Sequence, residues 1–280
     1  MPKFTRIADD TVQSSTKVSL SGPRSGVAKA IIAAAAIGGV LLAGASCTTN
    51  PYTGETQFAA YSDDQLSQLS AQAWQELKTE TPTLSSGAQY QRVQRVWKRV
   101  AAATPKAGEA WDVQVFDSDQ VNAFVMPGNR VGVYTGLLNI VENDDQLAAV
   151  LGHEVAHAIY RHANQRATRA AAASAAVQIG GSVLAGGSNG AVSADQVSAL
   201  GSVAANLGVV LPYSRNAELE ADLRGVDYMH GAGYDADAAV RLWEVMEAAG
   251  GQRTADFLST HPNPQYRREQ IRQYIQQKGY

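Results

Sequence analysis

Two histidines and a glutamate, close together in the sequence, form a pattern suited to metal chemistry. The stretch is His153-Glu154-Val155-Ala156-His157. Residues four apart on a helix lie one turn above each other, so both imidazoles can reach one cation. Glu154 is offset from that face, where it can contact a water on the metal instead of the metal itself. The spacing predicts His153 and His157 as metal ligands and Glu154 as the catalytic base, against the alternative of two ordinary core or surface histidines.

A hydrolytic zinc site needs a third protein ligand, because such sites hold zinc with three protein groups and keep a fourth position for water. The segment 214–222 reads SRNAELEAD and offers one. Glu218 and Asp222 lie four apart, hence on one helical face, and Ala221 with Gly225 are small enough to let this helix approach the histidine helix. Glu218 can then bind the metal, and Asp222 can accept the proton on the outer nitrogen of a liganding histidine.

Other polar groups near these motifs are expected to have ordinary roles. On spacing alone, Glu218 and Asp222 could instead form salt bridges with Arg215 or Arg224, and this alternative stays open. We expect Glu220 to be a solvated surface charge. We predict that His162 and His230 are surface or helix-end residues.

Hydrophobic periodicity predicts the elements that position these residues. One-sided apolar patterns with a period near 3.6 predict helices over 62–80, 90–103, 215–229, 235–249 and 264–277. Alternating patterns predict strands over 111–116, 121–126 and 130–135, with a turn at 127–129. The histidine helix is expected to begin after the capping residue Asn143, with Gln146 reaching back, and to end near Gln165. The fold class is therefore α+β and mostly helical, with a small antiparallel sheet beside the HExxH helix.

The charge balance argues against one large class of proteins. The chain has 280 residues, 23 Lys and Arg against 26 Asp and Glu, and a formal net charge of -3. Five basic and two acidic residues fall in 1–46, which leaves 18 against 24, or -6, for the rest. A net-acidic body without basic runs is poorly suited to neutralise phosphates, so we expect no nucleic-acid partner.

The N-terminal region has the layout of an export signal. Residues 30–46 carry no charge and follow basic residues, which is typical of a signal peptide. Small residues before Cys47 suggest lipidation there; an ordinary cut after 43–45 and an uncleaved anchor are the alternatives, and all three place the body outside the cytoplasm. We predict a signal peptide over 1–46, a tether over 47–61 and a metallopeptidase domain over 62–280.

The segment 170–211 is rich in Ala, Gly, Ser and Val. This composition favours Ala-rich helices packed closely through small residues. A mobile flap or a membrane-facing hairpin is the alternative for this segment.

Four separated motifs carry a family resemblance. NAFVMPGNRVGVYTGLL, HEVAH, SRNAELEAD and STHPNPQYR occur in this order. They resemble the zinc metallopeptidases that include the CAAX prenyl endopeptidases, HtpX and the Oma-type proteases, and CTTNPYTG resembles the start of the mature chain in bacterial periplasmic lipoprotein members. The resemblance covers roughly residues 47–275. It implies a zincin-like, gluzincin-like fold, one zinc ion per chain and Glu218 as the third ligand.

The resemblance also implies a reaction. The chain would be a zinc endopeptidase acting on misfolded or envelope proteins, in which Glu154 takes a proton from a zinc-bound water and passes it to the leaving amine. The family's His-Pro pair implies that His261 donates to the oxyanion; an inhibitory zinc ligand or an ordinary loop histidine are the alternatives. An extended substrate would add to the edge of strand 121–126 or 130–135.

Two other classes compete with this interpretation. The first is an envelope lipoprotein chaperone or assembly factor with a structural zinc, but a structural site does not need the base Glu154. The second is a prenyl-protein or intramembrane protease, which the absence of several long apolar spans disfavours. The expected partners are protein or peptide substrates and the membrane, through a lipid on Cys47. The expected location is the bacterial cell envelope, in a periplasm-facing outer-membrane lipoprotein.

Overall fold

The computed structural model describes residues 46–172, 213–250, 254–262 and 264–280. Apart from Ser46, the predicted signal peptide lies outside these residues. So does the Ala-rich segment beyond residue 172, and the predictions for it have no counterpart in the described structure. Among the described residues, no helix is both long enough and apolar enough to cross a membrane.

The region predicted to be a tether forms a hairpin that bonds to the body. Strand β1 (Ser46–Thr49) pairs antiparallel with β2 (Thr56–Ala59). The buried Asn50 side chain follows β1 and donates from Nδ2 to the Ile159 carbonyl, 2.7 Å away. Gln57 on β2 donates to the Tyr160 carbonyl at 3.2 Å. Both bonds satisfy carbonyls at the end of the histidine helix, where intrahelical partners run out.

Two amphipathic helices follow, as the periodicity predicted. Helix α2 (Asp63–Glu80) begins with a capping box, in which Ser62 and Gln65 bond to each other's backbone N–H. Helix α3 (Ala88–Ala102) buries an apolar stripe that includes Trp97. Both helices turn these faces toward the sheet that comes next in the chain.

The sheet has four strands in the order β3-β4-β6-β5, comprising β3 (Thr83–Leu84), β4 (Asp112–Phe116), β5 (Ala123–Met126) and β6 (Arg130–Tyr134). The β5–β6 pair is antiparallel as expected, and the short β3, which was not predicted, pairs antiparallel with β4. Strands β4 and β6, in contrast, run parallel. The reason is that β6, and not β5, is the strand of the β5–β6 hairpin that pairs with β4. Strand β5 therefore lies at the edge of the sheet. Gly128 (φ 83°) and Asn129 (φ 59°) form the left-handed turn of this hairpin.

Each face of the sheet packs against a different layer. Phe116, Phe124 and Tyr134 gather on one face with Trp74 of α2. Gly132 lies opposite Phe124 in the register, and a Cβ atom there would collide with the Phe124 ring. The valines of β4 and β6 point to the other face and join the main core, which α3 and the later helices cover.

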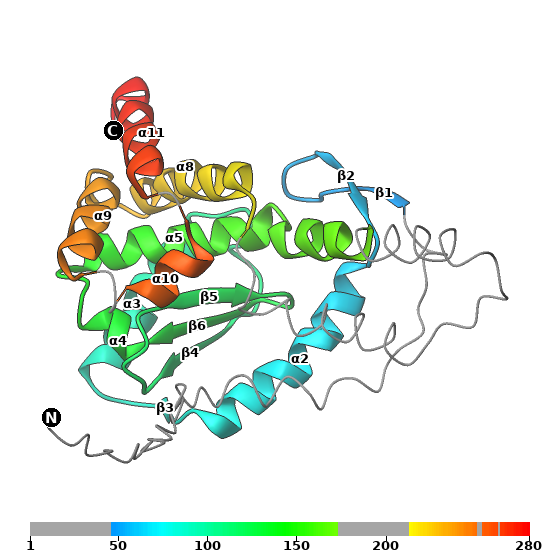
Figure 1. Ribbon diagram of the computed structural model, residues 1–280, viewed down its shortest axis with the longest axis horizontal. Helices are drawn as coiled ribbons and strands as arrows, with labels where there is room; N and C mark the ends of the chain where they lie inside the picture. The colour runs from blue at the N-terminus through cyan, green and yellow to red at the C-terminus, as the bar shows by residue number, and fades with distance from the viewer. Residues whose placement is uncertain (1–45, 173–212, 251–253, 263) are drawn as a thin grey trace, which may run out of the picture.

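Most of the remaining helices lie on the side of the sheet where β5 lies, whereas the short α4 follows directly at the end of β6 (Figure 1). Helix α5 (Asp144–Ile159) runs alongside β5, and α8 (Arg215–Gly231) crosses it on the far side. The other helices of this part are α4 (Thr135–Leu138), α9 (Ala238–Ala248), α10 (Ala255–Thr260) and α11 (Pro264–Lys278). The short α4 and α10 were not predicted from the sequence. The expected class, α+β and mostly helical with a small sheet beside the HExxH helix, is confirmed.

Candidate metal centre

Helix α5 carries both histidines of the HEVAH motif. Asn143 caps it as predicted, since its Oδ1 accepts from the Gln146 N–H at 2.9 Å, while the Gln146 side chain reaches back one residue further, to the Glu142 N–H. Nearly every residue of α5 is buried, so the polar motif is held inside the protein. The Nε2 atoms of His153 and His157 lie 2.9 Å apart, side by side on one face of the helix.

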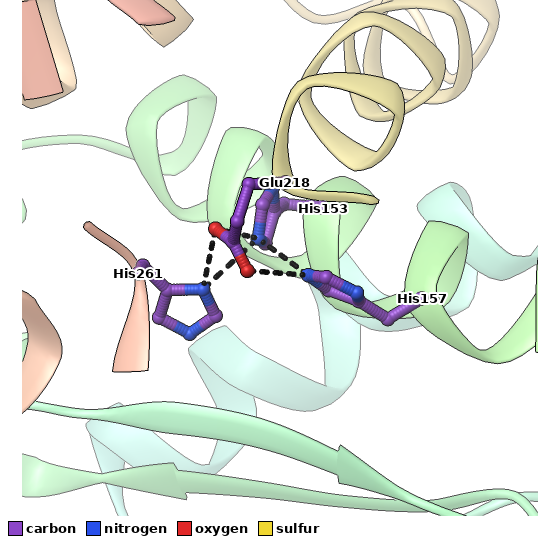
Figure 2. A group of neighbouring side chains, drawn as sticks. All are labelled: His153, His157, Glu218 and His261. Atoms are coloured by element: carbon purple, nitrogen blue, oxygen red, sulfur yellow. Dashed lines mark hydrogen bonds and ion pairs between the residues drawn. The ribbon is translucent and has the colours of Figure 1, made fainter. Parts of the chain in front are cut away.

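Glu218 reaches the two imidazoles from α8. Its Oε1 lies 3.5 Å from Nε2 of His157 and its Oε2 lies 3.7 Å from Nε2 of His153 (Figure 2). The helices approach this closely at two glycines: a Cβ on Gly152 would lie 2.6 Å from the Gly225 carbonyl oxygen, and one on Gly225 would lie 2.7 Å from the His153 nitrogen. No larger side chain fits at this crossing without moving one helix.

His261 enters the same group from the end of α10. Its Nδ1 lies 3.1 Å from Oε2 of Glu218 and 3.2 Å from Nε2 of His153, as Figure 2 shows. All four side chains are buried, and their ligand atoms lie within 4.8 Å of one another. The structure therefore brings three helices together at one point.

The residues of this group fit a metal ion. Oε1 of Glu218 and Oε1 of Glu154 are buried without a hydrogen-bond partner. Ring nitrogens that face one another across about 3 Å share a site where a cation would satisfy them all. Imidazole nitrogens with one carboxylate are a donor set that zinc prefers. The HEVAH and SRNAELEAD motifs, together with this cluster of side chains, imply a metal ion at this position.

Glu154 lies beside the group without joining it. Its side chain is 1% exposed, and Oε1 is 3.6 Å from Nε2 of His261. Burial raises the pKa of Glu154 to about 7, although the nearby His261 opposes the shift. A carboxyl group that titrates near neutral pH suits a group that must both take and return a proton.

Asp222 supports His153 from behind. Its Oδ1 lies 2.9 Å from Nδ1 of His153, on the ring edge opposite the metal group. Arg267 of α11 binds both oxygens of Asp222, at 2.5 and 2.6 Å, and also reaches Oε2 of Glu218 at 2.6 Å. Burial by itself would raise the pKa of Asp222, but the Arg267 guanidinium outweighs it and holds that pKa at about 2. Asp222 is therefore an anion that can accept the His153 N–H.

The alternative of a salt bridge to the arginines of α8 does not occur. Arg224 pairs with Asp227 at 3.4 Å, and Arg215 is exposed at the start of the helix. Arg267, which the sequence analysis quoted only as the last letter of STHPNPQYR, is the partner of both carboxylates. Its only signal in the sequence was its place in that motif, six positions after His261.

His162 lies at a helix end and Glu220 is partly exposed, but both make contacts that the sequence did not predict. His162 begins the helical stretch 162–172, but its side chain is only 1% exposed instead of lying on the surface. Its Nδ1 lies 2.8 Å from Nδ1 of His157, and its Nε2 lies 3.0 Å from Oε2 of Glu220. Tyr213, which the sequence analysis did not single out, stacks on the His157 ring with centroids 4.0 Å apart. His230, in contrast, is exposed near the end of α8, in agreement with the prediction.

Cys47 lies in β1 opposite Phe58, and its side chain is exposed. This position leaves the sulfur accessible. Attachment of a lipid to Cys47 stays a prediction.

The arrangement of helices and sheet defines the class of the protein. An HExxH helix beside the edge of a small sheet, crossed by a helix that brings a carboxylate to the two histidines, is the layout of zincin-like metallopeptidases. Residues 88–275 match Peptidase family M48. The chain belongs to this family of peptidases, so the predicted resemblance is confirmed.

Individual relatives refine this assignment. The chain is 37% identical to the mitochondrial metalloendopeptidase OMA1 of Schizosaccharomyces pombe over 65% of its own length and 52% of the relative's. It is 31% identical to the mitochondrial metalloendopeptidase OMA1 of Bos taurus over 81% of the chain and 46% of the relative. It is 26% identical to the beta-barrel assembly-enhancing protease of Escherichia coli over 85% of the chain and 49% of the relative. The chain thus spans about half the length of these curated relatives.

These relatives correct the predicted location. The OMA1 relatives are described as mitochondrial and match at higher identity than the bacterial protease. The prediction of a bacterial cell envelope location, in a periplasm-facing outer-membrane lipoprotein, is therefore wrong. The physical reason is that an uncharged apolar stretch reports only favourable transfer from water into lipid, which is common to all membranes.

Proposed function

We propose that the chain hydrolyses peptide bonds with one zinc ion held by His153, His157 and Glu218. The observation that carries the proposal is the convergence of these three buried side chains from two helices that cross at Gly152 and Gly225. Bound zinc would supply Lewis acidity, polarising the peptide carbonyl and lowering the pKa of water. We propose residues 62–280 as the peptidase domain, with the β1–β2 hairpin bonded to it.

Glu154 is the proposed general base. Its unpartnered Oε1 lies beside the ligand group, and burial poises its pKa near 7. It can therefore accept the proton of the attacking water and deliver it to the leaving amine. Asp222 would hold the proton on Nδ1 of His153, which keeps Nε2 free to bind the metal.

Two roles for His261 in the proposed reaction require two different positions of its ring. In the structure described, its Nδ1 lies among the ligand atoms, which supports a fourth place around the metal. A ring in that position would fill the site that a water needs. The predicted role of His261 as a donor to the oxyanion therefore requires the ring to leave the ligand group, and α10, only six residues long, is the element that would carry it.

The edge strand β5 is the proposed substrate platform. Strand β6 lies between β4 and β5, so of the two strands considered from the sequence only β5 has an edge for another strand. The backbone of Val125 on β5 hydrogen-bonds Glu154, which ties this edge to the base. An extended segment added along β5 would place its backbone near the metal with little dependence on sequence. This favours unfolded or misfolded protein as substrate.

Replacement of two glutamates separates catalysis from metal binding. We expect Glu154→Gln to retain zinc but to cleave unfolded casein at least about 10²-fold more slowly, because only the base is lost. Glu218→Gln should lose bound zinc. Zinc content by elemental analysis and cleavage of labelled casein check both outcomes, with Glu80→Gln on an exposed helix end as the control.

Full cleavage by the Glu154→Gln protein would contradict the proposed mechanism. The chaperone alternative predicts a different pattern. In that case the wild-type protein with bound zinc would leave casein intact, and both wild type and Glu154→Gln would suppress casein aggregation equally.

A further inference from the structure

His162 is a buried histidine outside the ligand group that nevertheless contacts a ligand. Its two ring nitrogens are both engaged: Nδ1 with Nδ1 of His157 at 2.8 Å, and Nε2 with Oε2 of Glu220 at 3.0 Å. Glu220 is partly exposed, with 34% of its side chain accessible. A continuous path of two contacts therefore connects a proposed metal ligand to a carboxylate at the protein surface.

A break in the helix is what brings His162 to this position. In an unbroken helix, residues five apart point about 140° away from each other, so His162 could not face His157. Helix α5 ends at Ile159, and Arg161 adopts a left-handed conformation with φ 57° before the helical stretch begins at 162. The turn folds His162 back beside His157.

Contacts from the N-terminal elements hold this break. Arg161 binds Oδ1 of Asp63 at 2.9 and 2.7 Å and Oγ1 of Thr48 at 3.0 Å. The Asn50 side chain donates a hydrogen bond to the Ile159 carbonyl. A non-glycine residue with positive φ costs energy and persists only where its surroundings fix it. The break is therefore a built feature of the fold and not a frayed helix end.

The geometry allows one consistent placement of protons. His157 presents Nε2 to the ligand group, and a neutral imidazole that binds a metal through Nε2 carries its proton on Nδ1. Two ring nitrogens 2.8 Å apart need one donor and one acceptor. Nδ1 of His162 is then the acceptor, its proton lies on Nε2, and that N–H donates to Glu220. The opposite placement would put a proton on Nε2 of His157, where the cation binds.

We propose that His162 and Glu220 are positioning residues that fix the Nδ1–H tautomer and the ring orientation of His157. The inference rests on the proposed zinc site and extends it to residues that do not touch the metal. His162 acts on the metal only through His157, as an acceptor for its outer proton. Tyr213 stacked on the His157 ring restrains the same ring from its face.

The wild-type protein gives the first test. ¹⁵N-labelled histidine in the full, zinc-loaded chain reports which ring nitrogen of each imidazole carries a proton. We expect protons on Nδ1 of His157 and on Nε2 of His162. A proton on Nδ1 of His162 would overturn the proposal, and this result requires no variant that could misfold.

Two substitutions at one position give the second test. His162→Asn keeps an oxygen near the place of Nδ1 that can accept from His157, whereas His162→Leu leaves that N–H without a partner. We expect His162→Leu to lower zinc affinity by about 10-fold, measured by competition with a chelator, and His162→Asn to recover most of the loss. His230→Asn, remote from the metal group, is the control and should match wild type.

Equal zinc affinities for the Leu and Asn variants would overturn the proposal, and far-ultraviolet circular dichroism of the metal-free proteins shows whether each has folded. The readouts are affinity and tautomer, so they are separate from cleavage. A protein that binds zinc with the expected tautomers but does not cut casein would contradict the proposed function and leave this inference standing.

Discussion

The two histidines of the HEVAH motif share a helix and a spacing, but they are supported in different ways. His153 donates to Asp222, a carboxylate that is itself buried and clamped by Arg267. His157 contacts a second imidazole, His162, which passes the interaction to the partly exposed Glu220. The support of His153 is a direct contact with a buried charge. The support of His157 runs through a second imidazole and ends at a carboxylate near solvent.

This difference predicts unequal strength. Charges that are kept from water interact more strongly, because solvent does not screen them. The same burial makes the first support costly to disrupt, since a charge left alone inside a protein is poorly solvated. We therefore expect the His153 support to govern stability and affinity, and the His157 support to act as a finer adjustment.

The largest expected effect comes from removing the buried cation of the His153 support. Arg267 is 2% exposed and pairs with both Asp222 and Glu218. We expect Arg267→Met to lower the free energy of unfolding of the metal-free protein by about 3–5 kcal/mol, because two buried carboxylates lose their partner. Urea unfolding in the presence of a chelator measures this loss.

Arg272 on the same helix provides the matched control. It is half-exposed and pairs with Glu269 at 2.8 Å. Arg272→Met should cost less than about 1 kcal/mol, as is usual for surface ion pairs. Similar losses for the two variants would show that burial does not set the strength of this support.

An intermediate effect is expected at the helix crossing that both supports share. Asp222 and Glu220 both lie on α8, and Gly225 sets how closely α8 approaches α5. We expect Gly225→Ala to destabilise the protein by about 1–3 kcal/mol and to weaken zinc binding, because the new Cβ pushes Glu218 away from the histidines. Thermal unfolding and chelator competition measure the two effects.

Gly231 lies on the same helix, but a Cβ there would make only an ordinary contact, 3.5 Å from Ala103. Gly231→Ala should therefore leave zinc affinity unchanged and preserve or raise stability. A Gly225→Ala protein with wild-type affinity would mean that the close crossing does not position the ligands.

The smallest effects are expected from replacing the carboxylate of each support, Asp222 or Glu220, by its amide. We expect Asp222→Asn to weaken zinc binding by about 10–100-fold. Glu220→Gln should weaken it by less than about 10-fold, because water and the amide can replace an exposed carboxylate. Zinc competition with a chelator ranks the two, and a larger loss for Glu220→Gln would reverse the comparison.

Measuring the same zinc affinities at high salt separates the buried carboxylate from the exposed one. At about 1 M salt the Debye length is about 3 Å, so an interaction with an exposed charge is largely screened. The ratio of wild-type to Glu220→Gln affinity should then approach one. The ratio for Asp222→Asn should persist, because that carboxylate is buried with its partners.

Local patterns accounted for much of the fold. Helices α2, α3, α8, α9 and α11 and strands β4, β5 and β6 lie where periodicity placed them, within a few residues at their ends. Helix α5 begins as expected but ends at Ile159, so the predicted end near Gln165 was wrong. The two short helices were missed because fewer than two turns carry little periodic signal. The parallel pairing of β4 with β6 was missed because strand order depends on contacts between distant segments, which no local pattern records.

The sequence by itself determined the spacing of His153, Glu154 and His157 and the pairing of Glu218 with Asp222 on one face. Both follow from the pitch of a helix, which is a local property of the chain. Only the tertiary structure decided that Arg267 would neutralise both carboxylates and that a break after Ile159 would return His162 to His157. Those contacts join residues far apart in the sequence or depend on a turn fixed by other elements, so they exist only once the whole domain has packed.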